Sequence, residues 1–137
     1  MGVITALGEL LSPQYLLMMI AGTMGGIMIG AMPGLTSVMG VTLLLPFTYG
    51  MDPAAGISML LAISFGAIYG GSITAILIGT PGTPASAATM IEGRQFTARG
   101  EGGRAIGLST FASWIGGTIS ALVLICVAPQ LAKLALK

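Results

Sequence analysis

Four long apolar segments, none of which contains a charged residue, constrain this chain more than any other feature. They run over residues 15–32, 35–51, 55–79 and 105–128. A helix needs about 20 apolar residues to cross the hydrocarbon core of a bilayer. The third and fourth segments reach that length, whereas the first two are shorter and predict tilted or partial spans.

The composition also predicts a membrane protein. The chain is 55% hydrophobic and 7% charged, whereas an average soluble domain is about 25% charged. Its apolar runs are continuous, which favours helices over strands of alternating polarity. We therefore expect an all-α fold: one polytopic transmembrane helix bundle over residues 1–137, embedded in the lipid bilayer.

Charge and residue types exclude several functional classes. The net charge of +1 provides no electrostatic footprint for nucleic acid. Histidine is absent and Cys126 is the only cysteine, so neither a disulfide nor a cysteine-based zinc site is expected. No acid–base pair, metal cluster or nucleophile–base arrangement stands out, and we predict that the protein is not an enzyme. The apolar segments lack the Asp, Glu or His of a proton relay.

Small residues recur every four positions and predict helix-packing seams. Such stripes let helix backbones approach closely. One stripe lies in the first apolar segment, another in the third, and a weaker pair begins the fourth. In chain order these are Gly22, Gly26 and Gly30; Ala62, Gly66, Gly70 and Thr74; and Gly103 and Gly107.

Two Pro-Gly breaks interrupt the hydrophobic pattern in a similar way. Pro33-Gly34 follows the first glycine stripe and Pro81-Gly82 follows the second. Each break ends one helix and is followed by hydroxyl residues suited to capping the next. Thr36 or Ser37 is the expected N-cap after the first break. After the second, Thr83 is the expected N-cap, with Pro84 at the first helical position.

Broken or re-entrant helices of this kind mark substrate sites in secondary transporters. A helix start presents free N–H groups and partial positive charge to a carboxylate, while carbonyl and hydroxyl oxygens suit Na⁺. The alternative is a pair of ordinary interhelical turns. The candidate substrate- and ion-binding residues are Gly34, Thr36, Ser37, Thr80, Gly82, Thr83, Ser86 and Thr89, with no other metal site expected.

A polar stretch over residues 80–104 separates the third and fourth apolar segments. It contains Arg94, Arg99 and Arg104, with Glu92 and Glu101 as expected partners. One interpretation is that the arginines hold an anionic substrate. We favour a cytoplasmic loop that obeys the positive-inside rule and is loosened by five glycines.

At these breaks the sequence resembles the large membrane subunit of tripartite tricarboxylate transporters, the TctA family. One resembling run, residues 22–36, reads Gly-Thr-Met-Gly-Gly-Ile-Met-Ile-Gly-Ala-Met-Pro-Gly-Leu-Thr. A second, residues 69–86, reads Tyr-Gly-Gly-Ser-Ile-Thr-Ala-Ile-Leu-Ile-Gly-Thr-Pro-Gly-Thr-Pro-Ala-Ser, followed by Thr89 and Glu92-Gly93. The resemblance covers nearly the whole chain.

The resemblance implies a multi-pass symporter of the bacterial inner membrane for carboxylates such as citrate. It also implies coupling to a cation, Na⁺, with no other cofactor. The expected partners are a small membrane subunit and a periplasmic solute-binding protein. Members of the family are several times longer, so this chain is expected to be the N-terminal part of a transporter. The alternative is a structural or assembly protein that only packs through its glycine stripes, and a passive channel is the weakest hypothesis.

Overall fold

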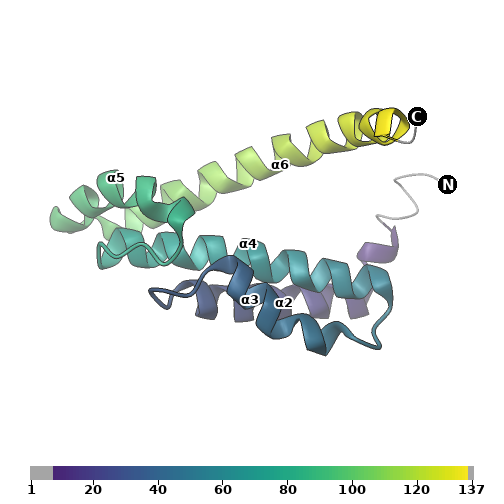
Figure 1. Ribbon diagram of the computed structural model, residues 1–137. Helices are drawn as coiled ribbons and strands as arrows, with labels where there is room; N and C mark the ends of the chain where they lie inside the picture. Colours follow the sequence, from purple (N-terminus) through teal and green to yellow (C-terminus); the bar gives the residue numbers. More distant parts are fainter. Residues whose placement is uncertain (1–7, 136–137) are drawn as a thin grey trace.

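The computed structural model describes residues 8–135, with side chains as far as Leu131, and these residues form helices without a strand (Figure 1). Three helices are long and apolar enough to cross a membrane: α2 (Pro13–Gly30), α4 (Pro53–Leu77) and the Gly102–Leu131 part of α6. The prediction of an all-α membrane bundle is therefore confirmed.

Helices α2 and α4 form the centre of the bundle, and they pack through the two predicted glycine stripes. Their contacts advance along both helices together, so the helices run parallel. Gly22 lies against Met59, Gly26 against Ile63 and Gly30 against Ala67. At each of these glycines an added Cβ would meet a backbone carbonyl of the partner helix. The two stripes are thus the seam that the spacing predicts.

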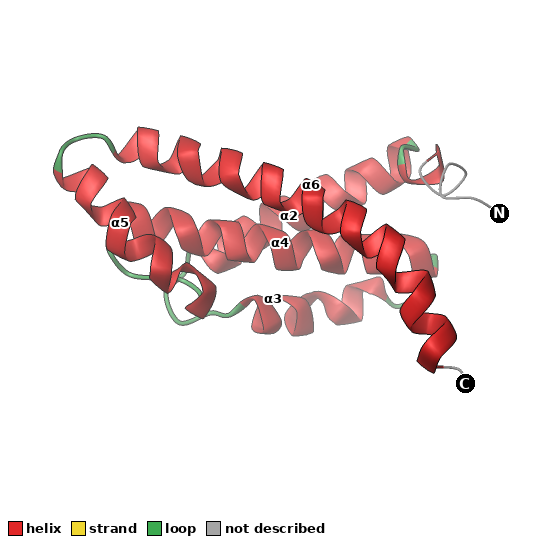
Figure 2. Ribbon diagram, turned by 90° about the horizontal axis from the view of Figure 1, so that it is seen from above, coloured by secondary structure: helices red, strands yellow, loops and turns green. Residues whose placement is uncertain are grey.

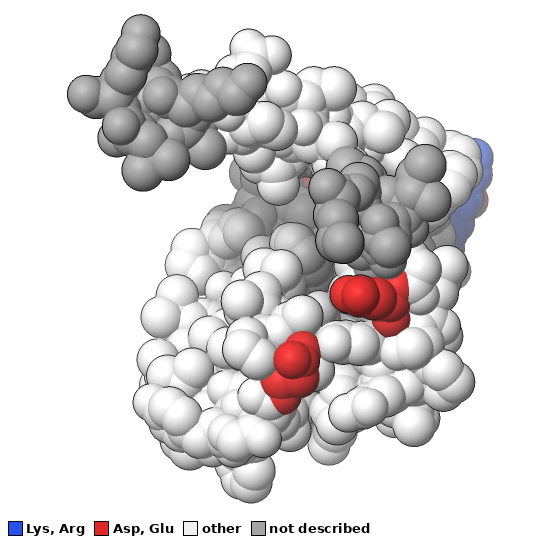
Figure 3. Space-filling model, turned by 90° about the vertical axis from the view of Figure 1, so that its right-hand side faces the viewer, with Lys and Arg blue, Asp and Glu red and all other residues white. Residues whose placement is uncertain are grey.

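A hydrogen bond fixes the beginning of this parallel pair. The Tyr15 hydroxyl on α2 donates to Asp52 Oδ2 at 2.8 Å, and the same oxygen accepts the Ala54 amide at 3.1 Å as the N-cap of α4. Figure 3 shows this end of the molecule, where acidic side chains lie among uncharged ones. Because α2 and α4 run parallel, their C-terminal ends and the Pro-Gly breaks that follow lie at the other end of the bundle, away from Tyr15 and Asp52.

The second apolar segment contains only a short helix. α3 (Ser37–Leu44) continues into the 3₁₀ turn η1 (Leu45–Thr48), and Pro46 lies at the start of that turn. The twelve residues from 37 to 48 would extend only about 18 Å as an α-helix, which is too short for a full span. α3 returns along the bundle to the beginning of α4.

The polar stretch 80–104 is not the loosened loop that its glycines predict. It forms the 3₁₀ turn η2 (Pro84–Ser86) and the helix α5 (Ala87–Ala98). Gly93 is buried inside α5, where an added Cβ would lie 2.6 Å from Ile76 Cγ1 of α4. This glycine serves helix packing, so its interpretation as a sign of flexibility is wrong.

Helix α6 (Gly102–Ala135) begins against α4 and α5 and then leaves the bundle (Figures 1 and 2). The Tyr69 and Thr110 hydroxyls, 2.7 Å apart, connect α4 to α6. Every described side chain of α6 beyond Thr110 is exposed. Gly103 and Gly107 would meet nothing within 4 Å if they carried a Cβ, so the predicted third seam is wrong within the described residues.

Candidate functional site

The second Pro-Gly break folds back into the bundle. Gly79, with a φ of +73°, ends α4 in a conformation that favours glycine. The Gly82 amide then donates to the carbonyl of Gly71 at 3.4 Å. Because Leu77 lies six residues beyond Gly71, the break returns about 9 Å along the α4 axis. This re-entrant geometry buries Gly82 and Thr83.

The second break meets the end of α2, just before the first break, where three glycines converge. A Cβ on Gly82 would overlap the carbonyl oxygen of Gly30 and lie 2.8 Å from the Cα of Gly71. Gly30 is the last residue of α2 and stands immediately before the first break. Figure 1 shows both breaks at one end of the bundle. We call Gly30, Gly71 and Gly82 the glycine junction.

Two of the predicted site hydroxyls lie against the glycine junction and are satisfied there. Thr83 is 3% exposed and Ser86 is 1% exposed. Ser86 Oγ donates to the Thr83 carbonyl at 2.7 Å and accepts the Thr83 amide at 3.3 Å. Thr83 at the N-cap of η2 and Pro84 at the first helical position are confirmed. These hydroxyls hold the shape of the break.

The remaining predicted residues surround the junction at different depths. Gly34, with a φ of +96°, is exposed and forms the first turn. Thr36 is the N-cap of α3, because its Oγ1 accepts the Met39 amide at 3.3 Å, and Ser37 is the first residue of that helix. Thr80 is exposed, and Thr89 is half-buried on α5. The structure therefore brings both breaks to one end of the bundle but separates the eight residues. Gly34, Thr36, Ser37 and Thr80 form a rim that solvent reaches, Gly82, Thr83 and Ser86 are buried, and Thr89 lies on a face of α5.

Two residues of α5 complete the end of α4: Arg94, which the sequence pattern suggested as an anion ligand or a loop charge, and Thr97, which it did not single out. Arg94 Nη1 on α5 donates to the Ile78 carbonyl at 2.6 Å, and Thr97 Oγ1 donates to the Ile76 carbonyl at 2.7 Å. These carbonyls lie at a helix end, where the last four lack partners within the helix. Arginine side chains can hydrogen-bond the last carbonyls of a helix, but Arg94 and Thr97 come from the next helix, so no local sequence signal reveals this role. Of the predicted Arg–Glu pairs, the described residues contain one, Arg104–Glu101 at 3.5 Å.

Replacing Thr97 with valine should lower the free energy of unfolding by about 1–2 kcal/mol, because the part-buried Ile76 carbonyl would lose its partner while the side-chain shape is kept. The matched control is Thr118→Val on exposed α6, whose hydroxyl bonds only the Trp114 carbonyl of its own helix. Denaturant titration in detergent measures both variants. Equal stability of the two would contradict the capping role of Thr97.

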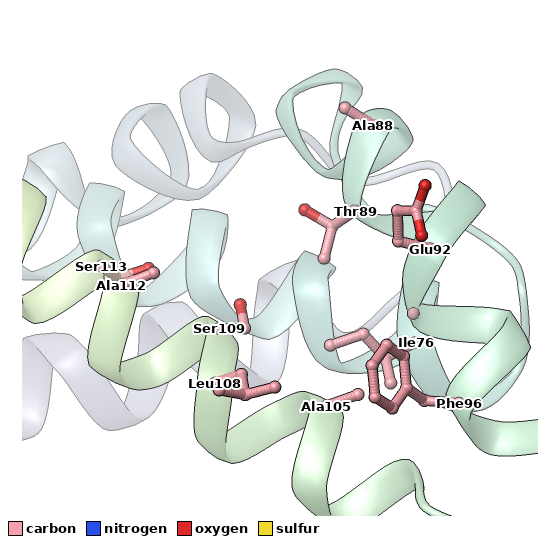
Figure 4. A pocket seen from close by; sticks show the side chains of 11 residues that line it. Ile76, Ala88, Thr89, Glu92, Phe96, Ala105, Leu108, Ser109, Ala112 and Ser113 are labelled. Carbon is pink, nitrogen blue, oxygen red and sulfur yellow. The ribbon is translucent and has the colours of Figure 1, made fainter.

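A groove of about 540 Å³ opens between α5 and α6 beside the second break (Figure 4). Its apolar part includes Ile76 of α4 and Phe96 of α5. Polar side chains come from both walls. They are Thr89 and Glu92 of α5 and Ser109 and Ser113 of α6.

Comparison with known proteins connects these features to a family. The profile of the Tripartite tricarboxylate transporter TctA family matches residues 16–137, a range that includes both breaks. An Agrobacterium vitis protein, described as an uncharacterized 52.8 kDa protein in the TAR-I ttuC' 3' region, is 38% identical over 127 residues. That alignment covers 93% of this chain and 25% of the relative, so the chain spans about a quarter of the relative's length. No solved structure matches the chain.

Proposed function

Because the chain belongs to the tripartite tricarboxylate transporter TctA family, we propose that it forms part of the membrane subunit that takes up tricarboxylates or related carboxylates. The observation that carries the proposal is the packing of the second break against the end of α2, which leads into the first break, at the glycine junction. Residues far apart in the sequence thereby form one irregular region at the end of two parallel membrane helices. Transport itself belongs to the completed transporter, since this chain spans a quarter of its relative.

The substrate site is proposed at the exposed rim of the junction. Both α3 and the η2–α5 segment begin there, each after a Pro-Gly turn. The free N–H groups of helix starts favour a carboxylate. Gly34, Thr36, Ser37 and Thr80 form the part of the rim that solvent reaches, whereas Thr83 and Ser86 support it from inside.

The coupling ion and the partners are further parts of the proposal. Na⁺ suits a site of carbonyl and hydroxyl oxygens. A small membrane subunit and a periplasmic solute-binding protein are the proposed partners, and the bacterial inner membrane is the proposed location. Uptake that proceeds equally in Na⁺, K⁺ and choline would contradict the coupling while leaving carboxylate transport intact.

A structural role is the second candidate, and the internal satisfaction of Thr83 and Ser86 favours it. In that case the breaks would only shape the bundle, and the chain would serve assembly through its glycine seam. Purified chain that binds no carboxylate but co-purifies with a larger membrane subunit would support this function.

Replacing Thr80 with valine tests the substrate site. Thr80 is exposed at the rim and makes no hydrogen bond with the rest of the described chain, so its loss should spare the fold. We expect the KM for citrate uptake to rise about tenfold, as befits one lost hydrogen bond to a charged ligand. Radiolabelled citrate uptake into vesicles that hold the complete transporter measures this, with Thr118→Val on α6 as the control. An unchanged KM would exclude Thr80 from the site.

A further inference from the structure

One face of α6 packs against the bundle where the helix begins. A Cβ on Gly102 would lie 3.1 Å from Leu77 of α4 and 3.1 Å from Thr97 of α5. The buried or half-buried residues of α6 are spaced three or four apart, which places them on one side of the helix. They are Gly102, Ala105, Ile106 and Ser109. The same spacing continues along α6 to four further residues, which we call the small face: Ala112, Ser113, Gly116 and Ser120.

The small face is uncovered in the described part of the chain. All four of its residues are exposed, because α6 diverges from α4 toward its C-terminal end (Figure 1). None of the apolar window in the span of α6 is buried, whereas half of the corresponding window of α4 is. Ala112 and Ser113 line the groove between α5 and α6, so this groove opens onto the beginning of the small face (Figure 4).

The opposite side of α6 has a different character. At 3.6 residues per turn, the residues that lie across the helix from the small face are bulky and apolar. They are Phe111, Trp114, Ile115, Leu122 and Ile125, and all are exposed. Such side chains suit lipid tails, whereas small residues on a membrane helix let a second backbone approach closely. The two sides of α6 therefore differ as a lipid-facing side differs from a helix-facing side.

The hydroxyls of the small face also favour a helix over lipid as its neighbour. Thr110 and Thr118, elsewhere on α6, donate to the carbonyls four residues earlier, at 2.8 and 2.7 Å. Ser113 and Ser120 make no such bond to a described residue. A hydroxyl left without a partner in hydrocarbon is costly, and serine hydroxyls form hydrogen bonds across helix interfaces in membranes.

We propose that the small face of α6 is a docking surface for an uncharged membrane-spanning helix from the part of the transporter that lies outside this chain. The chain spans 25% of its 52.8 kDa relative, so most of that length is available to supply the helix. No charged residue lies in the apolar segment that contains the small face, and an apolar helix with small or hydroxyl side chains fits it. The inference rests on the part of the proposed function that makes this chain one section of a membrane subunit. It is independent of the carboxylate site.

The accessibility of nitroxide spin labels to dissolved oxygen tests the docking surface. Ser120→Cys places a label on the small face, and Leu122→Cys places the control on the bulky side at a similar depth, both in a Cys126→Ser background without other cysteines. In the complete transporter in nanodiscs, we expect position 120 to be about threefold or more less accessible than position 122, because close-packed protein excludes lipid and its oxygen. In the isolated 137-residue chain, the two positions should be alike.

Ser113→Cys and Ile115→Cys repeat the comparison nearer the bundle and carry the test if a label at position 120 prevents folding. Equal accessibility of the two sides in the complete transporter would mean that lipid covers the small face, and would overturn the proposal. Shielding of position 120 already in the isolated chain, with spin–spin broadening, would identify a second copy as the occupant and would also overturn it. So would shielding that disappears when only the small membrane subunit is left out. Citrate uptake is not part of the readout, so a transporter that carries no citrate but shields position 120 would refute the proposed carboxylate transport and leave the docking surface standing.

Discussion

Replacing Gly26 with leucine should separate α2 from α4 and greatly reduce the stability of the bundle. A Cβ at this position would overlap the Ile63 carbonyl oxygen and lie 3.0 Å from the Ala67 amide nitrogen. Both obstacles are backbone atoms of α4, so no rotamer change relieves the overlap. Overpacking commonly costs 1–3 kcal/mol, and with rigid backbone on both sides we expect about 3 kcal/mol or more.

The measurement is the free energy of unfolding in mixed micelles. Gly107→Leu provides the matched control, because Gly107 lies on α6 with nothing within 4 Å of its Cβ position. We expect the control to keep wild-type stability. If both variants are equally stable, the α2–α4 seam is not the centre of the fold.

Replacing Gly82 with alanine should reduce transport about a hundredfold while leaving the α2–α4 pair assembled. The added methyl would overlap the Gly30 carbonyl oxygen and press on the Cα of Gly71. The second break would then move away from the first, and Thr83 and Ser86 would lose their place against α4. A displacement of about 1 Å in a binding geometry can cost about a hundredfold in rate, and we expect a fall of that order in citrate uptake.

Uptake by vesicles that hold the complete transporter measures this effect, and circular dichroism of the purified chain reports whether the helices persist. The matched control is Gly103→Ala, where the added methyl meets nothing within 4 Å. Wild-type uptake by Gly82→Ala would show that the glycine junction is not needed for transport.

The helix seam could be predicted from the sequence because it depends on local periodicity. Gly22, Gly26 and Gly30 share one face by spacing alone, and small side chains determine how closely two backbones can approach. The caps at Thr36 and Thr83 were predictable for the same reason, since each depends on a few consecutive residues. These features require no knowledge of which helices are neighbours.

The fold-back of the second break could not be predicted in this way. It depends on Gly82 meeting Gly30 and Gly71. The sequence pattern marks Gly30 as part of a packing stripe and Gly82 as part of a turn, but it does not indicate that they meet. Gly93 shows the opposite error, because composition indicates a loop residue while the structure buries it in α5 against Ile76. The meaning of each glycine is set by tertiary contacts.

The sequence predicted where the candidate site lies but not how its side chains are arranged. The two breaks do lie at the same end of the bundle, yet the Ser86 hydroxyl bonds the Thr83 backbone and the Thr83 hydroxyl lies 3.3 Å from that of Ser86. Glu92, which the sequence predicts as a loop residue paired with arginine, lines the groove instead because α5 is a helix that packs beside α6. The direction of the Glu92 side chain follows from that helix, which the glycines of the surrounding stretch 80–104 conceal.

Protection of the rim by substrate tests the central claim, that a carboxylate binds at the rim beside the two breaks. Cys126 is the only cysteine of this chain, so Cys126→Ser, with any cysteines of the rest of the transporter also replaced, supplies a background into which Thr80→Cys is introduced, with Thr118→Cys as the control. The rate of alkylation is measured in open membranes that hold the complete transporter, with and without citrate and Na⁺. We predict that citrate slows labelling at position 80 and leaves position 118 unchanged. Equal labelling rates at position 80 with and without citrate, in membranes that still transport it, would contradict the claim.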